Sequence, residues 1–212
     1  MGLSPNCGAR RNGLTPSLIV LHYTAMGSAD AAIARLCDPK AEVSAHYVIS
    51  RAGEITQLVS ENMRAWHAGA GEWAGQDDIN SRSIGIELDN DGVSPFSEPL
   101  MRALEHLARD IMKRHNIPPA GVIGHSDMAP GRKQDPGARF DWLRLERQGL
   151  AAPRAKGKAP ENPDTAQFRV LAQACGYTAN VDDDILLSAV RLRYRPWAQG
   201  PLAVEDFVPL RP

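Results

Sequence analysis

Two segments of the chain contain side chains suited to holding a metal ion. His22 ends an apolar run, and the segment GHSDMAPGRKQDPG supplies His125, Lys133 and Asp135. Imidazole nitrogen and carboxylate oxygen both coordinate zinc, and a catalytic zinc site takes three protein ligands and leaves its fourth position for water. Bound zinc lowers the pKa of water from about 15.7 toward about 7, so these residues predict metal-assisted hydrolysis.

The third metal ligand has two candidates in the sequence. Asp127 follows His125 by two residues. Asp135 follows it by ten, across a loop punctuated by glycine and proline that can fold back on the metal. Spacing favours Asp135 and leaves Asp127 open.

Glu87 is a candidate proton carrier. It lies between Ile86 and Leu88 in the apolar segment IGIELDN. Side chains alternate between the two faces of a strand, so Glu87 faces the site if its neighbours face the core. The alternative is a carboxylate that faces solvent. Asp89 shares the face of Glu87, and we expect it to cap the following turn.

The elements that must position these residues alternate between strands and helices. Strand patterns occur at 17–24, 81–90 and 121–125, and a hairpin pattern joins 43–50 to 54–60 through a turn at 51–53. Helix patterns occur at 28–38, 98–115 and 140–149. The short strand at 121–125 is expected to deliver His125 to a loop. This order predicts an α/β fold with a central mixed sheet flanked by helices.

The C-terminal part has a different composition. We expect a catalytic domain at 1–150, a proline-rich linker at 151–164 and a small helical module at 165–212. A unit of that size is marginal for a core of its own, so it is expected to dock on the main domain. Its Arg191, Arg193 and Arg195 form either a ligand-binding face or a solvated one.

Composition excludes several classes of partner and site. A net charge of −1 over 212 residues provides no field that attracts nucleic acid or an anionic membrane. The three cysteines form no CxxC pair, which favours free thiols in a reducing compartment. The apolar run at 18–21 is too short for a membrane span or a signal peptide. We therefore expect a cytoplasmic protein, or a periplasmic one if a leader has been removed.

Five motifs together resemble one family. HYT, VSAHYVI, RAWHAG, SIGIELDN and GHSDMAPGRKQDPGARFDW are similar, in that order, to the motifs of zinc-dependent N-acetylmuramoyl-L-alanine amidases of the type-2 amidase family, and most of all to its AmpD-like muropeptide amidases. The similarity covers roughly residues 5–148. It implies a Zn²⁺ cofactor held by His22, His125 and Asp135.

The same resemblance assigns the remaining site residues. It implies Glu87 as the catalytic acid and base, and Lys133 as the cation that stabilises the oxyanion of the intermediate. Substrate contacts are expected from Trp66, His67 and Asn80. The segment 165–212 is similar to the helical peptidoglycan-binding modules attached to many wall hydrolases.

His46 matches a recurrent histidine of the family. We expect it to line the substrate site or to support the structure, and not to bind zinc, because three ligands are already supplied.

The implied reaction is hydrolysis of the amide between N-acetylmuramic acid, in its 1,6-anhydro form, and L-alanine of the stem peptide. Peptidoglycan fragments are then the partners, in recycling or turnover of the cell wall. Two alternatives remain: an exported amidase that acts on the wall, and a non-catalytic peptidoglycan-binding protein on the same fold. The sequence does not indicate an oligomeric state.

Overall fold

A five-stranded mixed sheet is the centre of the computed structural model, which describes residues 4–210. Its strands follow the order β4-β3-β6-β2-β7, and β4 alone runs antiparallel to its neighbour. Their bounds are β2 Leu18–Tyr23, β3 Tyr47–Ile49, β4 Ile55–Gln57, β6 Ser83–Leu88 and β7 Val122–Gly124. The α/β architecture with helices on both faces of a mixed sheet is the one the sequence predicts.

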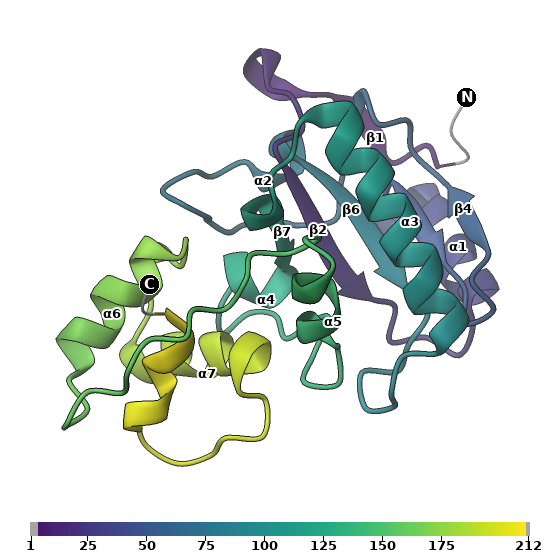
Figure 1. Ribbon diagram of the computed structural model, residues 1–212. Coiled ribbons are helices and arrows are strands. Elements are labelled where there is room, and N and C mark those ends of the chain that lie inside the picture. Colours follow the sequence, from purple (N-terminus) through teal and green to yellow (C-terminus); the bar gives the residue numbers. More distant parts are fainter. Residues whose placement is uncertain (1–3, 211–212) are drawn as a thin grey trace.

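Helix α3, Glu98–His115, covers one face of this sheet (Figure 1). It begins at the N-cap Ser97 and ends at Asn116, whose φ of 53° breaks the helix. Leu21 and Ile86 point to this face and are fully buried beside the apolar side of the helix. Side chains of neighbouring residues in a strand point to opposite faces of the sheet. His22 follows Leu21 and Glu87 follows Ile86, so the side chains of His22 and Glu87 point to the other face.

The C-terminal helices pack against that other face. Short helix α4, His125–Met128, lies between the sheet and the helices α6, Thr165–Ala174, and α7, Asp183–Tyr194 (Figure 1). One apolar cluster contains Val20 of the sheet together with Phe168 of α6. The C-terminal part thus shares a hydrophobic core with the sheet.

A smaller cluster lies beneath α1, Ala29–Cys37, which begins after its N-cap Ser28 within the helix pattern at 28–38. It is closed by a two-stranded antiparallel sheet of β1, Cys7–Ala9, and β5, Met63–Ala65, which the sequence pattern did not reveal. The remaining elements are short: α2 Ile79–Arg82, α5 Trp142–Arg147, and 3-10 turns at Arg11–Gly13, Pro39–Ala41, Pro119–Gly121, Val204–Asp206 and Val208–Leu210.

The turn of the β3–β4 hairpin depends on Gly53. Its φ of +86° lies in the left-handed region, and a Cβ there would lie 2.7 Å from the carbonyl oxygen of Pro99. Residues 151–164, the expected linker, contain no helix or strand. None of the helices formed by residues 4–210 combines the length and apolar character that a membrane crossing requires. Cys7, Cys37 and Cys175 are all free thiols.

Candidate functional site

His22 and Glu87 are neighbours on adjacent parallel strands. In the register of β2 and β6, His22 pairs with Glu87, just as Leu21 pairs with Ile86. Both side chains project from the face opposite α3, near the carboxyl ends of their strands. Strand register alone therefore places the imidazole beside the carboxylate.

His125 reaches the same place from β7, the strand on the other side of β2. The sequence predicted that this residue opens a loop, and that prediction is wrong: His125 is the first residue of the short helix α4. Asp127 causes the difference, because its carboxylate accepts the backbone N–H of Gly124 at 2.8 Å and so caps the first turn. The Nε2 of His125 lies 2.9 Å from the carbonyl oxygen of Ala68.

Asp135 completes the group from the loop that follows α4. Its Oδ2 lies 2.8 Å from Nδ1 of His22 and 3.0 Å from Nδ1 of His125. All three side chains are buried, and one ligand atom from each lies within 4.8 Å of the others. Two imidazole nitrogens and one carboxylate oxygen that converge in this way fit a zinc ion with an open fourth position.

Electrostatics favour the ligand forms of these groups. Burial, followed by the neighbouring His125, lowers the pKa of His22 to about 4, so its ring is neutral at pH 7. For Asp135, burial raises the pKa, but the close contacts with the rings of His125 and His22 outweigh it and hold the pKa below the ordinary value. Neutral imidazole and ionised carboxylate are the protonation states that bind metals.

Asp127, the alternative third ligand, is committed elsewhere. Its Oδ1 accepts the phenolic hydroxyl of Tyr177 at 2.7 Å, and its Oδ2 lies 2.8 Å from the guanidinium of Arg193. Both partners belong to the C-terminal part. The carboxylate therefore joins the two parts of the chain and does not take part in the group of His22, His125 and Asp135.

Glu87 has the properties of a proton carrier. Burial, with the nearby charge of Asp135, raises its pKa to about 8. Its Oε2 is buried and has no hydrogen-bond partner among residues 4–210. A buried carboxyl oxygen left free beside a metal-binding group is costly for stability and typical of a functional site.

A cavity of about 520 Å³ opens over these residues. His22, Glu87, His125 and Asp135 lie on its wall. The substrate-contact candidates Trp66 and His67 and the cation candidate Lys133 also line it, with Tyr23, Thr24, Ala25, Met26, Ala32, Arg35, Leu36, Val43, Ser44, Gly131, Arg132 and Gln134. The structure thus brings the expected metal, catalytic and wall residues into one concave site.

Asn80 supports the wall of this site. Its Oδ1 accepts the backbone N–H groups of His67 at 3.0 Å and of Ala68 at 2.8 Å, and the side chain is 6% exposed. It also lines a smaller adjoining cavity that contains Trp66 and Lys133. The structure therefore gives Asn80 a role in holding the RAWHAG segment. Direct contact between Asn80 and the substrate stays a prediction.

His46 is fully buried and does not line the main cavity. Its Nδ1 accepts the backbone N–H of Gly85 at 2.9 Å, and its Nε2 lies 3.1 Å from the carbonyl oxygen of Met63. Of the two roles that the sequence left open for His46, these contacts favour the structural one.

Arg132 and Ser83 are site residues that sequence reasoning missed. Arg132 donates to the carbonyl oxygens of Ala68 and Ala70, which holds the RAWHAG segment, residues 64–69, against the loop that contains Asp135. Ser83 lies 3.1 Å from Nε2 of His67. For Arg132 the available signal was its position beside Lys133 in the GRKQDPG motif, whereas no local pattern distinguished Ser83.

The C-terminal arginines are paired within the molecule. Arg191 and Arg195 both contact Asp206, and Arg193 contacts Asp127. Arg191 and Arg193 are less than a tenth exposed. The charges of these three side chains are thus paired within the molecule and do not form a solvated face, and Arg191 also lines a cavity, the second one described below.

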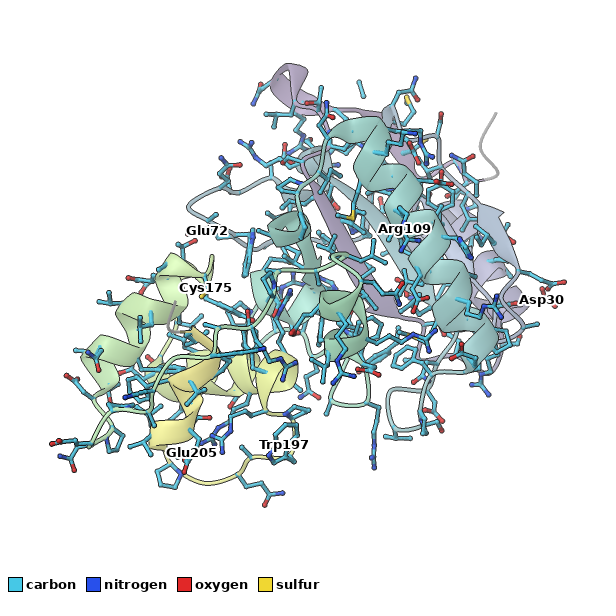
Figure 2. All side chains as sticks on the ribbon, viewed as in Figure 1. Asp30, Glu72, Arg109, Cys175, Trp197 and Glu205 are labelled. Atoms are coloured by element: carbon cyan, nitrogen blue, oxygen red, sulfur yellow. The ribbon has the colours of Figure 1, made fainter. Side chains whose placement is uncertain are left out.

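A second cavity, of about 640 Å³, lies between the loop at 131–134 and α7. Gly131, Lys133 and Gln134 line it, and they also line the first cavity. Pro196 also lines it, and the next residue, Trp197, is 71% exposed at the surface of the C-terminal part (Figure 2). The two cavities therefore meet at the loop that contains Lys133.

Comparison with known proteins agrees with this geometry. Residues 12–138 match the family described as N-acetylmuramoyl-L-alanine amidase. The chain is 37% identical to the N-acetylmuramoyl-L-alanine amidase AmiD of Escherichia coli over 209 residues, which cover 84% of this chain and 75% of that protein. It is 38% identical to the 1,6-anhydro-N-acetylmuramyl-L-alanine amidase AmpD of Haemophilus influenzae, over 66% of this chain and 86% of that one.

Solved structures extend the match to the C-terminal part. The complex of Escherichia coli AmiD with its substrate anhydro-N-acetylmuramic acid-L-Ala-D-gamma-Glu-L-Lys superposes with a TM-score of 0.84 at 34% identity, over 94% of this chain and 89% of that one. AmpDh3 of Pseudomonas aeruginosa, in complex with anhydromuramic pentapeptide, gives a TM-score of 0.81 at 33% identity, over 92% and 89% of the two chains. Fold, site and sequence agree, and the chain belongs to the N-acetylmuramoyl-L-alanine amidase family.

Proposed function

We propose that this protein hydrolyses the amide bond between N-acetylmuramic acid and L-alanine of the stem peptide, with zinc as its cofactor. One observation carries the proposal: His22, His125 and Asp135 converge beside Glu87, whose Oε2 is buried without a partner among the described residues. A three-ligand zinc site next to a free carboxylate in a cavity is the arrangement of a metal-assisted hydrolase.

The proposed substrate is a muropeptide in the 1,6-anhydro form. Two relatives that match nearly the whole chain have been solved with anhydromuramoyl peptides. A further relative is named as a 1,6-anhydro-N-acetylmuramyl-L-alanine amidase. Peptidoglycan fragments are therefore the proposed ligands, in the recycling of the cell wall.

His22, His125 and Asp135 would hold the zinc ion. Bound there, zinc would supply a Lewis acid that polarises the amide carbonyl and acidifies water. Glu87, which is half-buried, and Lys133, which is exposed, lie on the cavity wall where they can handle protons and charge.

Glu87 would take the proton from the attacking water and pass it to the departing amine of L-alanine. In the metal-free protein, burial raises the pKa of this carboxyl to about 8, so the group holds a proton more readily than an ordinary glutamate does. Lys133 would stabilise the negative charge that develops on the carbonyl oxygen.

Trp66 and His67 would form the wall against which the substrate lies. Trp66 is half-buried at the cavity, where its indole presents a flat apolar face suited to a sugar ring or a peptide stem. Burial, followed by the neighbouring His22, holds the pKa of His67 well below its ordinary value, so its ring meets the cavity as a neutral group.

The division into a catalytic domain at 1–150, a linker at 151–164 and a peptidoglycan-binding module at 165–212 is also our proposal. The cavity between the loop at 131–134 and α7 supports it, since it lies beside the catalytic cavity and next to the exposed Trp197. Replacing Trp197 by alanine is expected to weaken sedimentation of the protein with purified sacculi. Unchanged sedimentation would count against the module's role.

We further propose that the protein works in the cytoplasm. The free state of all three cysteines supports this location, because thiols persist in reducing compartments. Fractionation of the native host with an antibody to this chain would test it. Recovery with the periplasmic or envelope fraction would contradict the cytoplasmic location and favour the exported amidase.

Product analysis tests the reaction itself. Purified protein is incubated with anhydro-muropeptide, with and without a chelator, and the products are identified by mass spectrometry. We expect a free peptide that begins with L-alanine, and no product after chelation until zinc is restored. Alanine left on the sugar would indicate a peptidase acting on the stem. No product with zinc present would indicate a non-catalytic binding protein, and faster cleavage of intact sacculi would indicate a wall-acting amidase.

A further inference from the structure

Behind His22, on the side away from the metal ligands, a row of polar groups leads to a backbone carbonyl. The row starts at Ser83, which is fully buried. Its Oγ lies 2.6 Å from the carbonyl oxygen of Ile79 and 3.1 Å from Nε2 of His67. A carbonyl can only accept, so the single hydroxyl proton of Ser83 points to Ile79. The Oγ is then an acceptor toward His67.

His67 continues the row in the same direction. A neutral imidazole has one N–H, and the acceptor at Ser83 places that proton on Nε2 of His67. The other nitrogen, Nδ1, is therefore an acceptor, and it lies 3.0 Å from Nε2 of His22. His22 in turn must have its proton on Nε2. Its Nδ1 is left with a free lone pair, at the position 2.8 Å from Oδ2 of Asp135.

Two contacts hold the ring of His67 in place, the packing of the ring on strand β6 and a hydrogen bond from the backbone of His67. A Cβ added at Gly85 would lie 2.5 Å from Cγ of His67, so the imidazole packs directly on the strand at a position where no side chain fits. The backbone N–H of His67 donates to Oδ1 of Asn80 at 3.0 Å. The ring consequently has a defined orientation in which Nδ1 faces His22 and Nε2 faces Ser83.

We infer that His67 is a positioning residue that sets the tautomer of His22, through a one-way hydrogen-bond chain from His22 to His67 to Ser83 to the carbonyl of Ile79. A histidine presents Nδ1 to a metal only when its proton is on Nε2. Partners that fix a ligand's ring in this way are worth about 10–100-fold in metal affinity. The role differs from the substrate contact predicted for His67, and it rests on the zinc site proposed above.

The first test compares two substitutions of His67. His67→Asn keeps an acceptor oxygen near the position of Nδ1, whereas His67→Leu keeps bulk on Gly85 and removes the acceptor. Zinc affinity is measured by chelator competition on purified protein, with circular dichroism as the check on folding. We expect the leucine variant to bind zinc about 10–100-fold more weakly and the asparagine variant to stay within a few-fold of the wild type.

Two results would overturn the inference. One is a folded leucine variant that binds zinc as tightly as the wild type. The other is an equal loss of affinity in both folded variants, since then the acceptor atom would not matter.

A second test observes the tautomers directly. Long-range ¹H–¹⁵N spectra of the histidine rings distinguish Nε2–H from Nδ1–H, and we expect Nε2–H on both His22 and His67 in the metal-free and zinc-loaded protein. Nδ1–H on either ring would contradict the chain. Ser83→Ala removes the anchor, so it should shift the ring signals of His67 toward a mixture of tautomers. Neither test measures amide hydrolysis, so a failure of the proposed activity would be seen separately.

Discussion

His22 and Glu87 are directly paired in the register of two parallel strands. The metal-ligand candidate and the proton-carrier candidate therefore share one face of the sheet at one height. A slip of one residue between these strands would turn one of the two side chains toward α3 and away from the cavity. The relative position of the two groups is thus built into two inner strands of the sheet.

Replacing Asp135 by alanine should remove zinc and activity together. Two imidazoles alone hold a metal weakly, and the lost carboxylate contacts both rings, at 2.8 and 3.0 Å. Zinc content after dialysis, measured by mass spectrometry of the metal, is expected to fall to near zero. The double variant Asp127→Asn with Arg193→Met, which removes both charges of that buried pair, is the control, and it should keep its zinc because Asp127 contacts Tyr177 and Arg193 instead of the metal group. Zinc loss in the control alone would reverse the assignment.

Replacing Glu87 by glutamine should leave zinc bound and reduce kcat by about 10²–10⁴-fold, the usual contribution of a general acid–base group. Zinc content and steady-state kinetics on anhydro-muropeptide provide the two measurements. Asp89→Asn serves as control on the same strand face, because Asp89 pairs with Arg51 and does not line the cavity. Near-normal turnover in the Glu87 variant would remove it from the mechanism.

The raised pKa of Glu87 also predicts how stability depends on pH. In the metal-free protein the pKa is about 8 instead of the ordinary 4.5. Between these values the folded state binds more protons than the unfolded state, so the free energy of unfolding falls as the pH rises through this window. Glu87→Gln should remove that fall and stabilise the protein at pH 8.5 by on the order of a few kcal/mol. Urea denaturation at pH 4 and pH 8.5 measures it, with little difference between variants expected at pH 4.

Lys133→Met should lower kcat by about 10²–10³-fold and change the affinity for zinc little, because losing one donor to a developing oxyanion has that effect. The side chain lines the cavity without being part of the metal group. Lys156→Met, at an exposed position of residues 151–164, provides the control for loss of one positive charge. An equal kcat in the two variants would argue that Lys133 contributes only to the net charge of the protein and not to binding of the oxyanion.

Arg193→Met should destabilise the fold by about 3–5 kcal/mol, since it leaves the buried carboxylate of Asp127 without its cation. Arg193 is 4% exposed and Asp127 is 1% exposed. The double variant with Asp127→Asn should recover part of the loss. Arg169→Met is the control: its partner Asp183 is about half exposed, so the change should stay below about 1 kcal/mol. Chemical denaturation of the wild type, the Arg193→Met variant, the double variant and the Arg169→Met variant measures these changes in the free energy of unfolding.

The sequence was sufficient for the parts of the site that depend on local patterns. Strand alternation correctly placed Glu87 opposite Ile86, and strand ends correctly placed His22 and His125 at one edge of the sheet. The spacing within GRKQDPG allowed the return of Asp135, but the choice over Asp127 came from the resemblance to a family. The α3 helix was predicted at its observed bounds because its apolar spacing and its caps agree.

What the sequence could not reveal depends on partners far along the chain. The pairing of Asp127 with Arg193 joins residues 66 positions apart. Likewise, the contact between His67 and Ser83 arises only when β6 passes beneath the RAWHAG segment. In each case the side chain has several equally good local interpretations, and tertiary packing chooses among them.

The pairing of Arg193 with Asp127 limits how this enzyme can be recombined. One charge belongs to each part of the chain, and neither is tolerated alone in an apolar interface. A chimera that joins residues 1–164 to a C-terminal part without the equivalent arginine leaves the buried Asp127 without its partner. Exchange of such parts, in evolution or in engineering, therefore succeeds only when the carboxylate and the guanidinium are transferred or neutralised together.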